Sequence, residues 1–286
     1  MVSAAVESST VLPRVFCAVM TYEANHALRA KAVKSTWVKR CDGFSFFSSA
    51  NDSALKALDV GRPGACFTKI GAGEYRFLSK RVEATLEYIG AHHLQNYDFV
   101  LKADDDTFVF VDNLKQYLKD YNPSETTYFG HWFKMRGGYM SGGAGYVLSR
   151  GAVESYLARK GSTELCNTTV GGDEDFEMGR CMQALNVTMV DTRDKLGRQR
   201  FQPFPPQYHL MPARNDSGFE EYSAYPPDFG SNCCSSEAIS FHYVSPANMF
   251  AIDFLAYRLQ TTAFRGDDSF AEEHFDPSAV EPKKLT

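Results

Sequence analysis

The chain has 286 residues, of which 44% are apolar and 14% are aromatic, and its formal net charge is −5. This composition is typical of a folded protein with one large α/β core or two modest ones, and it excludes a largely disordered chain. The negative charge and the lack of a long basic run argue against a nucleic-acid partner.

The seven cysteines are too sparse for a small disulfide-stapled domain, and they lack the Cys-x-x-Cys spacing of structural zinc sites. Four glycosylation sequons begin at Asn51, Asn167, Asn186 and Asn215. Together with the cysteines they predict passage through an oxidising secretory compartment. The first 13 residues show neither a signal-peptide core nor a membrane span, so we expect no anchor within this sequence.

The first part of the chain predicts a parallel-sheet unit. An apolar run at residues 14–21 predicts a buried strand, and residues 44–48 predict a second one. Between them we expect a helix that Asn25 caps and whose apolar face includes Leu28 and Trp37. A strand, a helix and a strand at this spacing are typical of parallel sheets.

The rest of the chain continues this alternation of strands and helices. We expect a surface loop at residues 51–73 and, at residues 191–227, a segment without regular period that covers the substrate. The other expected elements are a helix at 75–92, strands at 99–101 and 108–111, a short helix from 112, a strand at 128–133, and helices at 149–157, after 175 and at 246–259.

Three consecutive carboxylates, Asp104, Asp105 and Asp106, separate two apolar runs. Ligands of open α/β sheets collect outside the carboxyl ends of the strands, so an Asp-x-Asp pair at this position suits a divalent cation. Oxygen ligands favour magnesium or manganese. Substrate phosphates usually complete the coordination shell of such an ion. The alternative is an acidic surface turn whose charges are solvated.

Two further segments hold candidate site residues. Residues 137–146 contain five glycines, so their backbone can approach a ligand closely or form a tight turn, although the spacing is not that of a Walker or dinucleotide motif. Asp173, Glu174 and Asp175 precede an apolar-periodic helix. The helix dipole alone favours acidic residues in a first turn, so this cluster is also explained without a functional role.

In combination, these motifs resemble the core 1 β1,3-galactosyltransferase family. The resemblance runs from about residue 15 to 259 and is carried by residues 101–107, 139–149, 179–182, 233–234 and 240–244. It implies an α/β GT-A fold, a Rossmann-like mixed sheet with helices on both faces. We expect a flexible segment at 1–13, a single catalytic domain at 14–262 and a flexible tail at 263–286.

The resemblance also implies an activity. Enzymes of this family use manganese and transfer galactose from UDP-galactose, with inversion, to the 3-hydroxyl of O-linked N-acetylgalactosamine. By this resemblance Asp104, Asp106 and His242 hold the metal, and Asp175 is the base that takes the acceptor proton. For His242 the alternative is a core histidine beside Tyr243.

Further roles follow from the same resemblance. Glu174 is expected to orient the acceptor sugar, and the glycine segment to line the donor pocket. The implied substrate-binding residues are Glu174, Tyr139, Gly142, Gly143, Tyr243 and Arg81. The implied disulfides are Cys17–Cys41, Cys166–Cys181 and a vicinal Cys233–Cys234, with Cys66 as a free thiol.

The chain departs from the family pattern at two places. Residues 218–227 lack the tryptophans that family members carry before Tyr-Pro-Pro, and Arg81 stands where they have lysine. Two rival hypotheses are a chaperone relative without the metal-binding triplet and a Fringe-like β1,3-glycosyltransferase with another donor or acceptor. The family's enzymes are type II membrane proteins of the Golgi and often dimers, so we expect glycoprotein acceptors, a nucleotide-sugar donor and a Golgi location, with a homodimer as an option.

Overall fold

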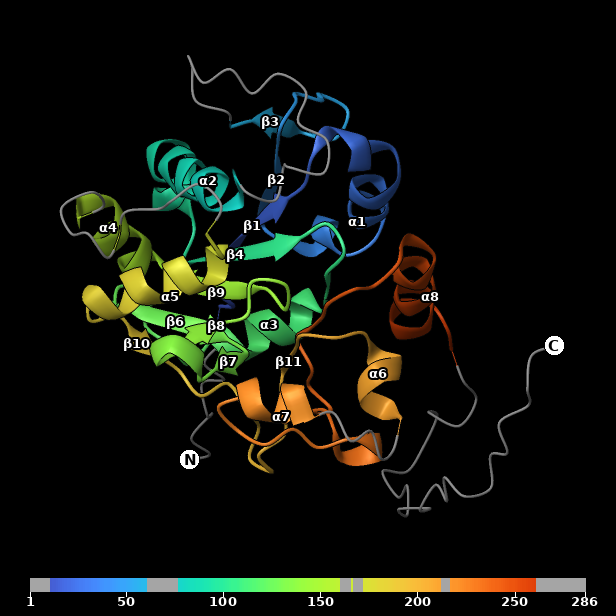
Figure 1. Ribbon diagram of the computed structural model, residues 1–286. Coiled ribbons are helices and arrows are strands. Elements are labelled where there is room, and N and C mark those ends of the chain that lie inside the picture. Colours follow the sequence, from blue (N-terminus) through green and yellow to red (C-terminus); the bar gives the residue numbers. More distant parts are fainter. Residues whose placement is uncertain (1–10, 61–76, 160–165, 167–171, 212–216, 261–286) are drawn as a thin grey trace, which may run out of the picture.

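The computed structural model describes residues 11–60, 77–159, 166, 172–211 and 217–260. Its centre is a seven-stranded mixed sheet with the order β10-β6-β9-β4-β1-β2-β3 (Figure 1). β9 is antiparallel to β4 and β6, and the other pairs are parallel. These strands are β1 Val15–Met20, β2 Gly43–Ser48, β3 Ala57–Asp59, β4 Phe99–Asp104, β6 Thr127–Gly130, β9 Tyr146–Ser149 and β10 Thr188–Met189.

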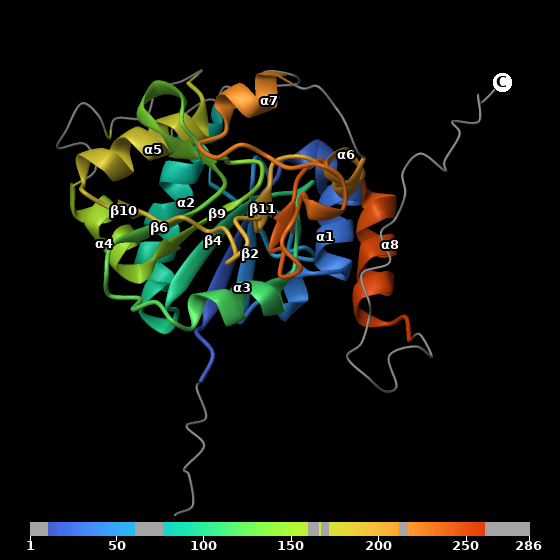
Figure 2. The same ribbon diagram turned by 90° about the horizontal axis from the view of Figure 1, so that it is seen from below.

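Helices cover both faces of this sheet (Figures 1 and 2). All six residues of β1 are buried, because alternate side chains enter two separate apolar clusters. One cluster is covered by α2, α4 and α5, and the other by α1, α3 and α8. The helices are α1 Lys31–Ser35, α2 Leu78–His92, α3 Val111–Leu118, α4 Arg150–Arg159, α5 Glu174–Ala184 and α8 Pro246–Tyr257. The α/β mixed sheet with helices on both faces, which the family resemblance implied, is confirmed.

Two small sheets lie beside the main one. The first has the order β11-β12-β5, with β12 antiparallel to β5 and Phe241 opposite Phe108. The second pairs β7 with β8. The remaining elements are β5 Phe108–Val109, β7 Trp132–Phe133, β8 Tyr139–Met140, β11 Phe201–Gln202, β12 Ser240–Phe241, α6 Pro206–Leu210, α7 Ser217–Tyr222, and the short turns η1 Glu23–Asn25, η2 His26–Ala30, η3 Val38–Arg40, η5 Leu94–Asn96, η6 Met135–Gly137 and η8 Gly230–Asn232.

The segment after β1 differs from the predicted helix. It is built from a 3-10 turn, a π-helical turn and the short helix α1. Asn25 caps no helix with its side chain, because its amide group donates a hydrogen bond to Asp105 instead (2.9 Å). Leu28 is 67% exposed, whereas Trp37 is fully buried as predicted. The regular α-helix that the sequence predicted is therefore interrupted where the chain contacts the Asp-rich turn.

Three other sequence predictions need correction. The loop expected at 51–73 contains β3, which pairs with β2, and its residues 61–73 lie outside the described part of the chain. The strand expected at 128–133 is divided at His131, whose buried ring bonds to the carbonyl of Phe201 (3.1 Å) and the hydroxyl of Ser223 (3.1 Å). Residues 191–227 hold β11, α6 and α7.

Three disulfides join the pairs that the family resemblance implied: Cys17–Cys41, Cys166–Cys181 and Cys233–Cys234. Cys66 lies outside the described residues, as do the sequon asparagines 167 and 215, residues 1–10 and residues 261–286. Asn51 and Asn186 are exposed. Among the described helices, none combines the length and the apolarity that a membrane crossing requires.

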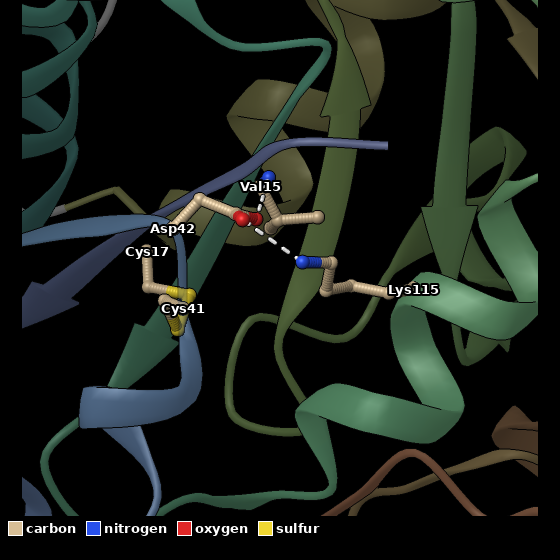
Figure 3. The surroundings of a disulfide bond; sticks show 5 residues. All are labelled: Val15, Cys17, Cys41, Asp42 and Lys115. Carbon is tan, nitrogen blue, oxygen red and sulfur yellow. Dashed lines mark hydrogen bonds and ion pairs between the residues drawn. A yellow bond between two sulfur atoms is a disulfide. The ribbon is translucent and has the colours of Figure 1, made fainter. Parts of the chain in front are cut away.

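The Cys17–Cys41 disulfide ties β1 to the end of η3, close to the ion pair between Asp42 and Lys115 (Figure 3). A cross-link over 24 residues removes conformational freedom from the unfolded chain. We expect Cys17→Ala/Cys41→Ala to lower the free energy of unfolding by about 2–4 kcal/mol, measured by chemical denaturation.

The vicinal disulfide supplies the matched control, because Cys233 and Cys234 are adjacent and their bond closes almost no loop. We expect Cys233→Ala/Cys234→Ala to destabilise the protein less than the Cys17/Cys41 double variant does. Equal losses from the two double variants would contradict the loop-closure explanation.

Candidate active site

The candidate site begins where β4 ends, at the carboxyl edge of the central sheet. The strand stops at Asp104 because the chain turns there, with the amide of Thr107 donating to the carbonyl of Asp104 (3.1 Å). The Thr107 hydroxyl donates to the carbonyl of Gly143 (2.8 Å). The Asp-rich turn is therefore anchored to the glycine-rich segment.

Three side chains from distant parts of the sequence form a candidate cation site. Asp104, Asp106 and His242 each offer one ligand atom, and these atoms lie within 4.8 Å of one another. His242 reaches the turn because β12 pairs with β5 and sets Phe241 opposite Phe108. Two carboxylates and an imidazole are suitable donors for manganese or magnesium, so the residues present fit a divalent cation.

The ring of His242 is held on several sides. Its Nε2 is 3.2 Å from Asp106 Oδ1, and its ring stacks on Tyr243 with centroids 3.8 Å apart. Tyr243 has a φ of 53°, a left-handed conformation that is uncommon for a bulky residue. A Cβ atom on Gly143 would overlap the His242 ring. Glycine at 143 is therefore what leaves room for the imidazole.

Asp105 and Asp106 of the turn have different electrostatic surroundings. Burial raises the pKa of Asp105 to about 6, although hydrogen bonds from Thr21 (2.6 Å) and Asn25 (2.9 Å) partly oppose this. Burial also acts to raise the pKa of Asp106, but the hydrogen bond and charge of His242 and the guanidinium charge of Arg29 together outweigh it. The pKa of Asp106 consequently lies below its ordinary value, as expected for a carboxylate that stays ionised beside cationic groups.

Asp175, the predicted base, is the second residue of α5. Its Oδ2 accepts a hydrogen bond from the amide of Gly142 (3.0 Å), and its Oδ1 accepts one from the amide of Phe176 (2.9 Å). Burial raises the pKa of Asp175, while the Gly142 bond and the ammonium of Lys102 oppose part of that rise. A raised pKa suits a carboxylate that must accept a proton near neutral pH.

Glu174 was expected to orient the acceptor sugar, but its side chain turns toward the sheet. It is 4% exposed, its Oε1 accepts a hydrogen bond from the hydroxyl of Tyr146 (2.7 Å), and its Oε2 is 3.4 Å from Lys102 Nζ. Burial raises the pKa of Glu174, and Lys102 counteracts this. Glu174 thus packs beside the cavity without lining it.

A cavity of about 520 Å³ brings most of the predicted site residues together. Three of the predicted residues, Tyr139, Gly142 and Glu174, do not line it. The ring of Tyr139 packs instead against those of Phe176 and Phe133, with centroids 6.0 Å and 5.6 Å away. The seven predicted residues in its wall are Arg81, Asp104, Asp106, Gly143, Asp175, His242 and Tyr243.

Sequence reasoning missed three residues of this region. Lys102 is buried between the candidate cation ligand Asp104 and Glu174 of α5, and its signal was a lone lysine inside an apolar strand. Arg29 places its Nη1 3.0 Å from Asp106 Oδ2, and nothing in the helix pattern distinguished it from a solvated arginine. Phe204 lines the cavity with Phe133 and Tyr243, from the segment expected to cover the substrate.

The fold and the site together define the class of the protein. A candidate cation site at the carboxyl edge of a mixed α/β sheet, beside a half-buried carboxylate, fits the arrangement of a GT-A glycosyltransferase. Residues 10–196 match the Fringe-like family. The chain belongs to this family and is a glycosyltransferase.

The similarity extends to individual relatives. Glycoprotein-N-acetylgalactosamine 3-beta-galactosyltransferase 1 of Xenopus laevis is 37% identical over 257 residues, which cover 88% of this chain and 68% of that protein. The Beta-1,3-glucosyltransferase of Mus musculus is 25% identical over 70% of this chain, and the match spans 42% of that protein's length.

Two solved galactosyltransferase structures are also similar. LgtC in complex with donor and acceptor sugar analogues has a TM-score of 0.38 and 11% identity, over 81% of this chain and 88% of that one. A Drosophila beta-1,4-galactosyltransferase 7 with manganese, UDP-Gal and xylobiose has a TM-score of 0.36 and 11% identity, over 75% of this chain and 82% of that one. The family assignment rests on the sequence matches.

The contact between Gly143 and the His242 ring predicts a specific defect. In Gly143→Ala the new methyl group must displace the imidazole, so we expect manganese affinity in the presence of UDP to fall about 10- to 100-fold, measured by titration calorimetry.

Gly90→Ala is the matched comparison, because its Cβ would meet the end of the Leu157 side chain rather than the histidine, and Gly90 lies in α2 outside the cavity wall. We expect this variant to keep manganese affinity within about threefold of the wild type, well short of the loss that follows a displaced ligand. Equal losses in the two variants would show that the His242 ring does not depend on Gly143.

Proposed function

We propose that this chain transfers galactose from UDP-galactose to the 3-hydroxyl of N-acetylgalactosamine O-linked to glycoproteins, with inversion at the sugar's anomeric carbon and with manganese. The observation that carries the proposal is that the three candidate cation ligands and Asp175 line the same cavity. The 37% identity to a relative whose name describes this reaction supports the choice of donor and acceptor.

In this proposal Asp104, Asp106 and His242 hold the cation. When bound, the cation neutralises the charge that grows on the diphosphate as it leaves the sugar. Arg29 lies at the same edge of the cavity, and its guanidinium adds a fixed positive charge beside Asp106. These groups favour departure of the nucleotide because they act where negative charge develops.

Asp175 acts on the other reactant. As the acceptor oxygen forms its bond to the anomeric carbon and the bond to the UDP oxygen breaks, the carboxylate takes the proton of the attacking hydroxyl. The amides of Gly142 and Phe176 fix the orientation of this carboxylate. A single displacement of this kind inverts the configuration and requires one base, which the site supplies.

The acceptor sugar would meet an aromatic wall. Phe133, Phe204 and Tyr243 line the cavity, and Tyr243 is 58% exposed. Phe219, which lies where family members have a tryptophan-containing run, is buried and packs against Phe204 (5.2 Å). Rings of this size give a sugar face apolar contact area, so the missing tryptophans have aromatic substitutes in the cavity.

The different aromatic wall also favours a second candidate function, in which the same site uses another sugar donor or acceptor, as a Fringe-like transferase does. The chaperone hypothesis is weaker, because the three cation ligands are present and close together. We further propose a Golgi location, glycoprotein acceptors and the option of a homodimer, on the basis of the family membership.

A panel of UDP-sugars with a GalNAc-bearing glycopeptide and manganese tests the proposal. We expect UDP-galactose to be consumed with formation of a β1,3 linkage, and chelation of the metal with EDTA to abolish the reaction. Consumption of a different UDP-sugar would support the second candidate, and no turnover with any donor would support the chaperone hypothesis.

The base assignment predicts the behaviour of Asp175→Asn. Because asparagine keeps the shape but cannot accept the proton, we expect kcat to fall by about 100-fold or more, while manganese-dependent UDP binding stays close to that of the wild type. The measurements are steady-state transfer kinetics and UDP titration calorimetry. Loss of UDP binding equal to the loss of transfer would contradict the base role.

Asp173→Asn is the matched control for this variant. Asp173 lies two residues earlier, is exposed, and pairs with Arg136 at the surface (3.1 Å). Surface ion pairs contribute little to stability, so we expect kcat to stay within about twofold of the wild type.

The raised pKa of Asp175 predicts the acid limb of the pH profile. The carboxylate must be ionised to accept a proton, so transfer is present above its pKa and is lost as the pH falls through it. Because burial raises this pKa, we expect kcat/KM at saturating manganese to decline at a pH above the ordinary aspartate value of about 3.9. A profile flat down to that value would argue against Asp175 as the base.

A further inference from the structure

Lys102 lies between the two halves of the candidate site and is 3% exposed. Its Nζ is 2.8 Å from Asp104 Oδ1 and 3.4 Å from Glu174 Oε2, and it donates a hydrogen bond to the carbonyl of Gly142 (3.1 Å). A buried ammonium is costly unless its donors are satisfied. Here three acceptors from three separate elements surround it.

We infer that Lys102 is a positioning residue that holds the cation ligand Asp104 and the base Asp175 in one fixed frame. The inference rests on the proposed function, in which these two carboxylates act on the donor and the acceptor. Lys102 itself does not line the cavity and acts only through its neighbours.

The link to the cation site is direct. The ion pair with Lys102 engages Oδ1 of Asp104 and so fixes the orientation of a carboxylate that offers one ligand atom to the candidate cation site. Groups that orient a metal ligand in this way affect both its geometry and the affinity of the site. Since Lys102 and Asp104 are two residues apart in β4, both side chains project from the same face of the sheet.

The link to the base runs through two short paths. On the first, Lys102 holds the carbonyl of Gly142, whose amide in turn donates to Asp175 Oδ2 (3.0 Å). On the second, Lys102 holds Glu174, the residue before Asp175. Tyr146 completes this path, because it pairs with Lys102 across β4 and β9 and its hydroxyl binds the other oxygen of Glu174. The two paths close a ring that includes the start of α5.

A simpler role for Lys102 would be to neutralise the buried charge of Glu174. Under that role, the double variant would regain the stability and kinetics of the wild type, because neither member of the pair is left as an unpaired buried charge. Under the positioning role, the double change relieves the charge imbalance but still releases Asp104 and Gly142. The two roles therefore predict different kinetics for one double variant.

The experiment compares Lys102→Met, Glu174→Gln and Lys102→Met/Glu174→Gln with the wild-type protein. Each variant is measured for thermal unfolding, manganese-dependent UDP affinity, kcat and the acceptor KM. Lys115→Met is the matched control, because Lys115 forms an ion pair of similar length with Asp42 (2.9 Å), on α3 and away from the cavity (Figure 3).

For the double variant we expect UDP affinity at fixed manganese to fall about 10-fold or more and kcat about 100-fold, with the acceptor KM unchanged. A loss of less than about tenfold in kcat would overturn the inference. Glu174→Gln is isosteric and interrupts only the second path, because Lys102 stays beside Asp104 and Gly142, so we expect it to lose less kcat than the double variant and to keep its UDP affinity. A loss of UDP affinity of about 10-fold in Glu174→Gln, in which Lys102 still holds Asp104, would overturn the inference even if the double variant failed to fold.

Failure of the proposed function would be visible separately. If the wild-type protein used a different donor, the comparison of variants would be made with that donor, and the UDP titrations would be unaffected. Lys115→Met is expected to match the wild type in kcat and UDP affinity, and a loss comparable to that of the double variant would show that any lysine ion pair produces the effect.

Discussion

The structure depends on how negative charge is neutralised at one edge of the central sheet. Carboxylates that are withdrawn from water repel one another and ionise less readily unless cationic groups compensate them. The cationic groups come from separate elements, Lys102 from β4 and Arg29 from η2, and the His242 imidazole, from the residue after β12, lies 3.2 Å from Asp106. The carboxylates concerned are Asp104, Asp106, Glu174 and Asp175.

The small sheet β11-β12-β5 is what makes this compensation possible over a long sequence distance. The pairing of Phe241 with Phe108 brings the end of β12 alongside the start of β5, so that the next residue, His242, faces Asp106. The amide of Val244 then donates to the carbonyl of Asp106 (2.8 Å), which fastens the chain beyond the histidine. A backbone ladder of two residue pairs thus places a side chain that the cation site needs.

Much of the fold follows from local sequence patterns, whereas the site does so only in part. β1 and residues 99–101 of β4 are continuous apolar runs buried on both faces, which is the pattern of a parallel sheet, and the Asp triplet at the end of β4 marked the edge where the cavity lies. β3 was missed because an edge strand of three residues is too short to show a recognisable alternation of apolar and polar residues. The place of His242 came from family resemblance, since strand pairing between distant segments leaves no local pattern.

Lys102 shows why the remaining part of the site could not be predicted. A lysine in a strand usually marks an exposed position, and its burial becomes understandable only when Glu174 and Gly142 are seen beside it. The turns before α1 pose the same difficulty. Asn25 has the residue type of a helix cap, but its side chain is used by Asp105, a partner 80 residues away.

The antiparallel position of β9 between β4 and β6 gives the glycine-rich connection a fixed length. Lys102 faces Tyr146 only in the present register, and side chains in a strand alternate between the faces of a sheet. One inserted or deleted residue between β8 and Tyr146 would turn the tyrosine toward the opposite layer of helices. Indels in residues 141–145 should thus be tolerated far less well than indels in connections remote from the cavity, whatever residues they introduce.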